Sequence, residues 1–335
     1  MRREAYARVG LLGNPGDLFE GRAIALTLAN FRAAVTIEPA ARFEIVPGAD
    51  DRIEYPSLVE AAEVLDAYGC EDGVRLLRAA LRKAVELRGG LGDLPRDDPR
   101  LCFRIGYETN VPRQVGLAGS SAIVIAALRA LGDWLGPRLE PAELADAALA
   151  CETEELGITA GPMDRVAQAY EGLVAMDFAR PRRADSYRRL DPSRLPPLFV
   201  AWNPRGGAPS RIQHSDVRQR WLRGDADVRS LVSDLVALAD AGERELESRN
   251  ATALVQLLDQ NFEVRARVYP VSDVDRELVA LARARGAGAK MCGSGGAVIG
   301  ALRDPSLWPS LSADYVRAGY AAQVVRIQLP APSGA

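Results

Sequence analysis

An α+β protein with two domains is the fold class that the sequence predicts. Strand-like and helix-like segments are mixed along the chain without a regular βαβ alternation, which argues against a doubly wound sheet. Arg, Pro, Asp and Ser accumulate around residues 180–197, a composition typical of a connection between domains. A chain of 335 residues is also long enough for two packed domains. We therefore place an N-terminal domain at residues 1–185 and a C-terminal domain at residues 195–330.

Both kinds of element are expected in the N-terminal half. Alternating positions rich in β-branched and aromatic residues predict strands at 5–12, 33–46, 101–108 and 173–178. Apolar residues at helical spacing predict helices at 57–68, 72–88, 120–135, 141–156 and 163–170. Pro141 suits the first turn of the fourth of these helices, because a proline there removes no intrahelical hydrogen bond.

The C-terminal half is expected to be mostly helical. Long amphipathic segments predict helices at 214–222, 226–247, 251–268, 273–285 and 306–318. Two short strands should flank a glycine-rich turn at 293–296, and a last strand is predicted at 322–327. The chain contains no internal repeat and no low-complexity tract, so neither half is a repeat array.

Charge and hydropathy exclude several classes of partner. The formal net charge is −3 and no Lys/Arg block is longer than a few residues, so we expect no basic surface for nucleic acid or an anionic membrane. The first residues lack the apolar run of a signal peptide, and no segment approaches the roughly 20 apolar residues of a membrane span. We expect a cytoplasmic protein, either a monomer or a homodimer.

The residue types available for chemistry are restricted. A single histidine, His214, excludes metal sites built from several histidines and leaves one candidate base for a Ser-His or Cys-His nucleophile. The four cysteines are far apart and form no CxxC pair, so we expect reduced thiols. Catalysis therefore has to use Asp, Glu, Ser, Lys, Arg and backbone groups.

The segment Pro112–Ala122, PRQVGLAGSSA, lies between a predicted strand and a predicted helix. Its glycines let backbone N–H groups approach a ligand, and the helix start adds unpaired donors and a positive dipole end. Ser120 and Ser121 place hydroxyls where they can bind a phosphate oxygen or Mg²⁺. These features predict a phosphate-binding loop of neither the P-loop nor the dinucleotide type. The alternative is a Gly-Ser loop in which Ser120 only caps the helix.

A second candidate segment runs from Glu152 to Arg165, ETEELGITAGPMDR. A carboxylate-rich helix ends at a glycine, and a short loop brings Asp164 onto the next helix. A kinase needs one carboxylate for the metal and one to orient or deprotonate the attacking hydroxyl. The alternatives are a solvated helix face for Glu154 and Glu155, which we favour for at least one of them, and a helix N-terminal carboxylate for Asp164.

Two further turns are candidates for a substrate pocket. The first is the glycine-rich segment 290–297, KMCGSGGA, and the second is the opening segment 8–21, RVGLLGNPGDLFEG. The alternatives are a hairpin turn for the first and an ordinary Asn-Pro-Gly-Asp turn for the second.

Together these four segments resemble the motifs of the GHMP kinase superfamily, in the order expected for it and over nearly the whole chain, about 5–327. The resemblance implies a ribosomal protein S5 domain 2-like N-terminal domain and a ferredoxin-like C-terminal domain. Within the superfamily, the phrases RVGLLGNPGDLFEGR, TNVPRQVGLAGSSAIV, ELGITAGPMDRVAQAYEGLVAMDF and HSDVRQRWLRGD resemble the glucuronokinase family.

The resemblance implies a role for each motif position. Asp164 would be the catalytic aspartate, with Arg8 against it and against the transferring phosphate. Ser121 and Glu152 would bind Mg²⁺, with Glu155 in reserve because some members space this pair differently. The ATP phosphates would lie against Pro112, Gly116, Leu117, Ala118, Gly119, Ser120, Ser121 and Ala122. The substrate would contact Asn14, Asp17, Arg113, Gln114, Arg165, Arg218, Gly293, Ser294 and Gly295.

The implied reaction transfers the γ-phosphoryl group of ATP to a sugar hydroxyl in the presence of Mg²⁺. The resemblance points to D-glucuronate as acceptor and to its anomeric hydroxyl as the attacking group. An arginine suits the substrate carboxylate best, and the candidates are Arg113, Arg165, Arg218 and Arg220, with Lys290 and backbone groups as the alternative. Other acceptors, namely a neutral hexose, arabinose, a heptose phosphate or a mevalonate-like alcohol, stay open, as does a catalytically silent ligand-binding homologue.

Overall fold

The computed structural model describes residues 1–49, 51, 73–179, 183, 185–206 and 211–330, so the helix predicted at 57–68 lies outside the described residues. Strands from the N-terminal half form one sheet with the order β3-β4-β2-β5-β6, in which β1 pairs with β2. All these pairs are antiparallel except β3 with β4. The strands are β1 (Arg2–Leu12), β2 (Arg22–Pro39), β3 (Glu44–Val46), β4 (Phe103–Thr109), β5 (Leu173–Asp177) and β6 (Tyr187–Leu190).

Strand β2 differs most from the sequence prediction. We expected one strand at 33–46, whereas β2 already begins at Arg22 and ends at Pro39, before a separate β3. Both faces of β2 are covered: Ala23 and Ala25 belong to one buried cluster, and Ile24 and Leu26 belong to another. A strand buried on both faces shows no alternation of apolar and polar residues, so its first half gives no period-two signal.

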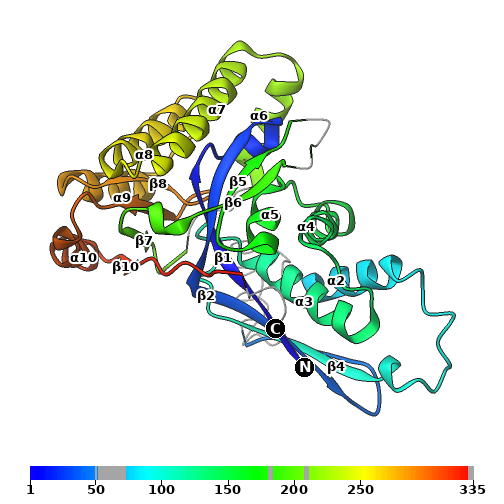
Figure 1. Cartoon of the computed structure of the whole chain (residues 1–335). Coiled ribbons are helices and arrows are strands. Elements are labelled where there is room, and N and C mark those ends of the chain that lie inside the picture. The colour runs from blue at the N-terminus through cyan, green and yellow to red at the C-terminus, as the bar shows by residue number, and fades with distance from the viewer. Residues whose placement is uncertain (50, 52–72, 180–182, 184, 207–210, 331–335) are drawn as a thin grey trace, which may run out of the picture.

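One helical layer covers a face of this sheet. It comprises α2 (Gly73–Leu87), α3 (Gly119–Leu135), α4 (Pro141–Ala150) and α5 (Met163–Tyr170), all drawn on the same side of β1 and β2 in Figure 1. The helices predicted at 72–88, 120–135 and 163–170 are confirmed. The helix predicted at 141–156 ends earlier, at Ala150, and continues as a π-helical turn over Cys151–Glu155.

The second sheet has the order β10-β7-β9-β8 and is antiparallel throughout. Two of its crossovers are helical, which gives the strand order of a ferredoxin-like fold. The structure thus confirms the α+β class and the glycine-rich turn between two short strands. Strands β6 and β7 were not predicted, because both are short and are surrounded by Pro and Arg residues. The strands are β7 (Leu198–Trp202), β8 (Gly288–Met291), β9 (Ala297–Ala301) and β10 (Ala321–Val324).

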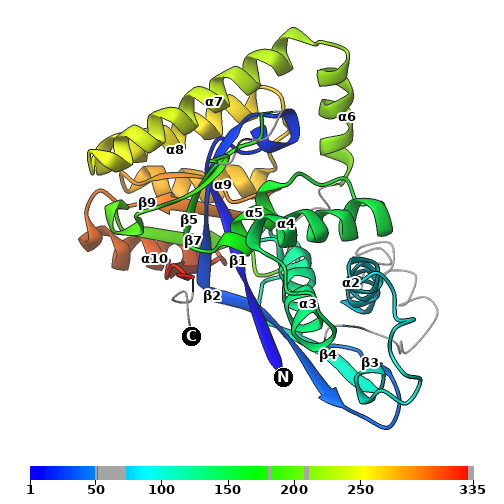
Figure 2. The same cartoon turned by 45° about the vertical axis from the view of Figure 1, so that its right-hand side comes forward.

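The C-terminal helices form a second layer on the opposite side of the long strands (Figure 1). Helix α6 stands apart from this layer (Figure 2). Its main contacts are with α7 and with the 3₁₀ turn at Gly16–Phe19, between β1 and β2. The helices are α6 (Arg211–Leu222), α7 (Ala226–Glu247), α8 (Ala251–Ala266), α9 (Asp273–Ala284) and α10 (Trp308–Arg317). Single 3₁₀ turns are η1 (Gly16–Phe19), η2 (Pro99–Leu101), η4 (Pro192–Arg194) and η5 (Pro305–Leu307).

The two halves share one buried cluster. Leu26 on β2 belongs to the same cluster as Leu235 on α7, Leu258 on α8 and Ile299 on β9. This shared core fixes the β1–β2 turn against the glycine turn between β8 and β9. The sheets change between β6 and β7, but the domain limits of 185 and 195 stay a prediction, since β6 reaches Leu190.

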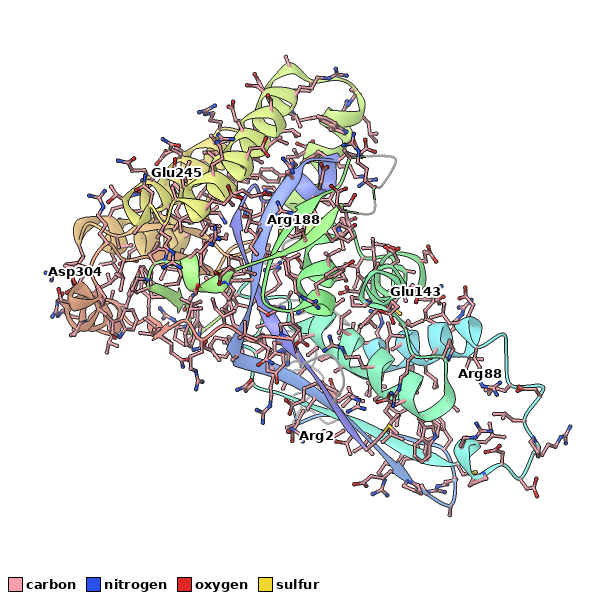
Figure 3. The ribbon with its side chains drawn as sticks, in the orientation of Figure 1. Arg2, Arg88, Glu143, Arg188, Glu245 and Asp304 are labelled. Carbon is pink, nitrogen blue, oxygen red and sulfur yellow. The ribbon has the colours of Figure 1, made fainter. Side chains whose placement is uncertain are left out.

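Charged side chains such as Arg2, Glu143 and Asp304 lie around the periphery in Figure 3. None of the helices in the described ranges combines the length and the apolarity needed to cross a bilayer.

Candidate active site

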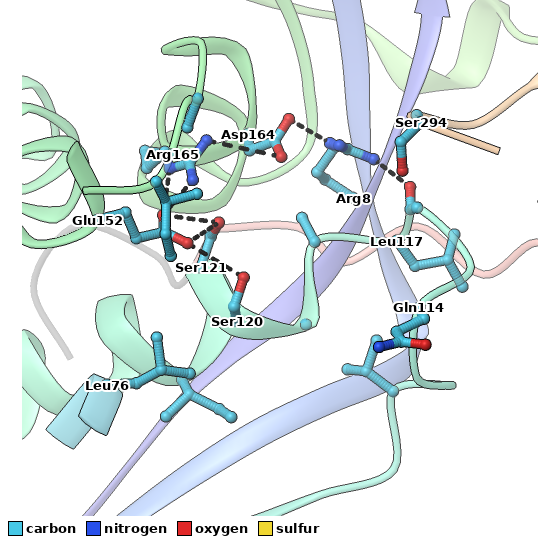
Figure 4. A pocket seen from close by; sticks show the side chains of 18 of the residues that line it. Arg8, Leu76, Gln114, Leu117, Ser120, Ser121, Glu152, Asp164, Arg165 and Ser294 are labelled. Atoms are coloured by element: carbon cyan, nitrogen blue, oxygen red, sulfur yellow. Dashed lines mark hydrogen bonds and ion pairs between the residues drawn. The ribbon is translucent and has the colours of Figure 1, made fainter. Parts of the chain in front are cut away.

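A cavity of about 330 Å³ opens at the N-terminal end of α3. Its walls include four parts of the chain that carry the predicted motifs: Arg8 on β1, the loop before α3, the segment that carries Glu152 and Asp164, and the turn with Gly293. Figure 4 shows Arg8, Asp164, Arg165 and Glu152 joined in a row by hydrogen bonds and ion pairs, with Ser120 and Ser121 next to Glu152. The fold therefore brings all four predicted motifs to one place.

The start of α3 points its first turn into the cavity. Residue Ala118 precedes the helix in a left-handed conformation (φ 58°) and provides no side-chain cap. The N–H groups of a first helical turn have no intrahelical acceptor, so those of Gly119, Ser120 and Ser121 remain available to an anion at the positive end of the helix dipole. The alternative in which Ser120 caps the helix is therefore wrong.

Both serine hydroxyls lie against one carboxylate. The Oγ of Ser121 is 3.0 Å from Glu152 Oε2, and the Oγ of Ser120 is 3.1 Å from Oε1. Glu152 is only 1% exposed, because the π-helical turn after α4 rotates it inward. π-helical turns inside helices are frequent at functional sites.

The neighbouring glutamates face elsewhere. Glu155 forms an ion pair of 2.9 Å with Arg82, and the side chain of Glu154 is 68% exposed. Neither residue lines the cavity. The geometry therefore favours Glu152 over the reserve candidate Glu155, and Glu154 lies on a solvated face as expected.

Arg165 lines the cavity beside this carboxylate. Its Nε donates to Glu152 Oε2 at 2.5 Å and its Nη2 also contacts that oxygen, while Nη1 donates to the carbonyl of Gly161 at 2.8 Å. The guanidinium is also 3.7 Å from Asp164 Oδ2. Arg165 therefore holds the two carboxylates together, and its predicted contact with substrate stays a prediction.

Arg8 joins three of the motifs. Its Nε donates to Asp164 Oδ1 at 2.6 Å, and its Nη1 donates to the carbonyl of Gly116 at 2.6 Å. At position 293 only glycine fits, since a Cβ there would lie 2.4 Å from the Gly116 carbonyl oxygen and 2.8 Å from Arg8 Nη1. The phosphate-loop candidate and the C-terminal glycine turn therefore pack directly on Arg8.

Asp17 reaches the same end of the cavity from η1. Its Oδ2 accepts a hydrogen bond from the N–H of Met163 at 3.3 Å, next to Asp164 on α5. Burial of the side chain and, secondarily, the nearby charge of Asp164 raise the pKa of Asp17 to about 6. Two carboxylates therefore share this part of the pocket, and Asp17 holds its proton more tightly than an ordinary aspartate.

The remaining predicted residues divide into two groups. Asn14, Arg113, Gln114 and Ser294 line the cavity, together with every predicted residue from Pro112 to Ser121. Four others do not line it: Ala122, Gly295, Arg218 and Arg220.

Each of these four lies elsewhere for a specific reason. Ala122 is buried in the core of α3, and Gly295 packs against the carboxylate of Asp275. Arg218 is exposed on α6, and Arg220 forms an ion pair of 2.9 Å with Asp225. The predicted contacts of Ala122 and Gly295 with ligand and of both α6 arginines with substrate are therefore not supported by this geometry.

The sequence reasoning missed one end of the cavity. Leu76 on α2, Tyr107 on β4 and Asp51 line it, and the Tyr107 hydroxyl donates to Asp51 Oδ1 at 2.8 Å. These residues belong to ordinary amphipathic elements and form no motif. Only the packing of α2 against α3 brings them to the cavity, so no signal in the sequence identifies them.

Comparison with known proteins agrees with this geometry. Residues 76–172 match the model of the GHMP kinases N terminal domain. Glucuronokinase 1 of Arabidopsis thaliana is 37% identical over 337 residues, covering 98% of this chain and 92% of that protein. A crystal structure of mevalonate kinase has a TM-score of 0.74 at 17% identity and covers 98% of this chain and 100% of that chain.

Galactokinase from Lactococcus lactis, solved in complex with galactose, is also similar in structure. Its TM-score is 0.73 at 14% identity, covering 97% of this chain and 93% of that chain. The chain belongs to the GHMP kinase superfamily. It is thus a phosphotransferase that has an alcohol group as acceptor.

Proposed function

We propose that the protein is an ATP-dependent sugar-acid kinase that phosphorylates D-glucuronate at the anomeric hydroxyl. The relatives named glucuronokinase cover most of the chain and support this substrate class. The observation that carries the proposal is the cavity itself, where the Arg8–Asp164 pair faces the Ser120–Ser121–Glu152 cluster across the N-terminus of α3. This arrangement offers one place for a phosphate chain and one for an acceptor.

The ATP phosphates are best accommodated by the loop Gly116–Ser121. Backbone N–H groups and the dipole of α3 favour an anion there. The apolar end of the cavity, with Leu76, Tyr107 and Ile123, then faces the nucleoside. A flat adenine ring suits such a wall, since ligand pockets are mostly apolar with a few placed polar groups.

The donor set fits Mg²⁺. Three side chains supply a cluster of oxygen atoms, because the hydroxyls of Ser120 and Ser121 lie 3.1 Å and 3.0 Å from carboxylate oxygens of Glu152. Mg²⁺ prefers oxygen ligands and keeps several of its waters. Arg165 and the Ser121 hydroxyl both contact Oε2 of Glu152, whereas Oε1 is contacted by the two serine hydroxyls and not by Arg165. When bound, the ion would neutralise charge on the phosphates.

In the proposed transfer, the anomeric oxygen attacks the γ-phosphorus in line. A bond forms between that oxygen and phosphorus, the bond to the β–γ bridging oxygen breaks, and ADP leaves with the electron pair. The acceptor proton passes to Asp164 or to solvent. Because Asp164 is paired with Arg8, its main role is to orient the attacking hydroxyl. The anomeric hydroxyl is the most acidic hydroxyl of a sugar and therefore needs the least help from a base.

A coupled assay of ADP release tests the proposal. Purified protein with ATP and Mg²⁺ would be given glucuronate, glucose, galactose, arabinose, a heptose phosphate and mevalonate, with Asp164→Asn protein as the control. We expect the largest kcat/KM for glucuronate and no acid-dependent release by the variant. Preference for any other acceptor, or no release with any acceptor, would contradict the proposal.

A cytoplasmic site of action is part of the proposal. A kinase needs ATP, which the cytoplasm supplies. Three described cysteines are free thiols, which agrees with a reducing compartment: Cys102, Cys151 and Cys292.

A further inference from the structure

Lys290 on β8 lies behind the substrate end of the cavity without lining it. The side chain is 1% exposed, and its Nζ donates to three oxygens: Asn14 Oδ1 at 2.6 Å, the Gly10 carbonyl at 2.7 Å and the Met291 carbonyl at 2.7 Å. Three acceptors match the three N–H groups of an ammonium ion, whereas a planar guanidinium could not reach all three. The chain contains only one other lysine, Lys83, among its 42 Lys and Arg residues.

The charge of Lys290 has no direct counter-ion within the part of the chain that the structure describes. All three acceptors of its Nζ are neutral oxygens, and no ion pair involves this residue. Burial, together with the nearby charges of Arg265 and Arg8, lowers the pKa of Lys290 well below its usual value. The three short contacts from Nζ to oxygen acceptors are the hydrogen bonds that an ammonium donates. A buried cation without a carboxylate is costly unless an anion comes close.

The turn that carries Asn14 is held by residues of the C-terminal half. Buried Asn261 on α8 accepts a hydrogen bond from the Gly13 N–H at 2.7 Å and donates to the Asn14 carbonyl at 3.3 Å. The Asn14 side chain lies over Gly10, where a Cβ would approach its amide group to 2.6 Å. The backbone and side chain of Asn14 are therefore both fixed.

The Lys290 contact decides which way the Asn14 amide faces. An ammonium can only donate, so the amide oxygen has to face Lys290, and the NH₂ group takes the opposite direction. Asn14 lines the cavity, and its Nδ2 forms no hydrogen bond with the described residues. The Asn14 Nδ2 group is therefore a donor available to the cavity, and the Lys290 ammonium lies on the other side of the same amide.

We infer that Lys290 is a positioning residue for acid specificity: it orients Asn14 so that the Nδ2 group donates to the carboxylate of the sugar acid. The inference rests on the proposed function, since it assigns the group that the acid would contact. An anionic carboxylate satisfies the Asn14 donor and lies in the field of the buried ammonium. A neutral hydroxymethyl group gains little from that field, so the pair selects acid over neutral sugar.

Two substitutions test this inference. Asn14→Asp keeps an oxygen for Lys290 and converts the donor into a second oxygen, so the fold should hold while a substrate carboxylate is repelled. Lys290→Met removes the charge and leaves the Asn14 amide unfixed. Lys83→Met is the matched control, because Lys83 is also buried but pairs with Glu86 and Glu154 away from the cavity.

The readout is the ratio of kcat/KM for glucuronate to kcat/KM for glucose, with the KM for ATP and the thermal midpoint. We expect this ratio to fall by about 100-fold in Asn14→Asp and by at least about 10-fold in Lys290→Met, mainly through KM for the acid. The KM for ATP should stay within about twofold, and Lys83→Met should keep the wild-type ratio.

The outcomes separate the two proposals. If the wild-type protein does not use glucuronate, the proposed function fails before the inference is reached. If the wild-type protein uses glucuronate and folded Asn14→Asp keeps the wild-type ratio, the inference is wrong whatever Lys290→Met does. A loss of acid preference in Arg113→Met, with none in Asn14→Asp, would assign the carboxylate to the rim of the cavity and also overturn it.

Discussion

The two sides of the cavity treat buried charge in opposite ways. On the side of α3 and α5, each of the two carboxylates proposed to act in catalysis or metal binding has an arginine partner: Asp164 pairs with Arg8 and Glu152 pairs with Arg165. On the side of the glycine turn, Lys290 donates only to neutral oxygens. The first side is electrically balanced without a ligand, so it can hold a fixed catalytic geometry. The second side carries the Asp275 carboxylate at the glycine turn, but Lys290 has no ion pair with a described residue, so this side is suited to recognition of an anion.

Arg265 extends this contrast. Its Nη1 donates to the carbonyl of Gly293 and its Nη2 donates to the carbonyl of Ser294 at 3.4 Å, while the guanidinium lies 5.4 Å from the ring centre of Tyr269. No ion pair with a described residue involves it, and burial lowers its pKa. The turn that faces Arg8 is thus supported from behind by a second cation, which adds to the positive potential on this side.

Removing the carboxylate of the balanced pair should have the largest effect. Asp164→Asn leaves Arg8 without its charge partner and the acceptor hydroxyl without its orienting group. We expect kcat to fall by about 10²–10⁴-fold while ATP still binds, because general-base and positioning roles have this size. Kinetics together with an ATP titration of the folded variant would measure both effects. Near-normal kcat would show that Asp164 has no catalytic role.

Asp17 sits between the two sides and should make stability depend on pH. Its folded pKa of about 6 exceeds the ordinary 3.8, so the folded protein binds this proton more tightly than the unfolded chain. That contribution is complete below pH 3.8 and is lost as pH rises through about 6. Asp17→Asn, which can still accept from Met163, should therefore be more stable than wild type at pH 7–8 by about 2–3 kcal/mol.

Urea unfolding of both proteins at several pH values would measure this difference. The gap should close as pH falls toward 4, because the wild-type aspartate is then protonated in the folded state. A gap that is independent of pH, or that widens in acid, would mean that the pKa of Asp17 is not raised.

Glu152 and Glu155 offer a matched pair for the metal site. Glu152→Gln and Ser121→Ala should each raise the Mg²⁺ concentration for half-maximal rate by about tenfold, because each removes one of few protein ligands. Glu155→Gln should not change it, since Glu155 pairs with Arg82 outside the cavity. A metal phenotype in Glu155→Gln alone would reverse the assignment.

The smallest effect is expected at the rim. Arg113 is exposed and lines the cavity, whereas Arg218 is exposed on α6 away from it. Solvent screens exposed charges, so Arg113→Met should raise the KM for the sugar acid or ATP by only about two- to fivefold. Arg218→Met should leave both KM values unchanged. A larger increase of the KM for the sugar acid in Arg113→Met would contradict the view that the substrate carboxylate is recognised by buried Asn14 and Lys290 and not at the exposed rim.

The sequence was sufficient to identify the balanced side of the site. Glycines, serines and carboxylates at fixed spacing imply a helix start and a following loop, and the resemblance to GHMP kinases assigns Ser121, Glu152, Asp164 and Arg8 to one site. The structure brings these four residues together. The local sequence pattern did not show that the π-helical turn at Cys151–Glu155 directs Glu152 into the cavity and leaves Glu155 outside it. That separation depends on packing of the turn against α2, which no spacing rule contains.

The other side could not be derived in the same way. The role of Lys290 depends on three oxygens from β1, the β1–β2 turn and β8, which only the shared core of the two halves brings together. The contacts of Arg165 with Glu152 and Asp164 could not be derived either, because a buried arginine and a substrate-binding arginine look alike in sequence. The prediction missed the first half of strand β2, because burial on both faces removes the alternation of apolar and polar residues that identifies a strand.

Phosphorus NMR of the reaction products shows whether the protein phosphorylates the anomeric hydroxyl of glucuronate. Wild-type protein would be incubated with ATP, Mg²⁺ and equimolar glucuronate and glucose, and the phosphate resonances correlated with sugar protons. We expect one new phosphomonoester, coupled to the anomeric proton of glucuronate. A phosphate on glucose, on another hydroxyl of glucuronate, or no new phosphomonoester would contradict this prediction.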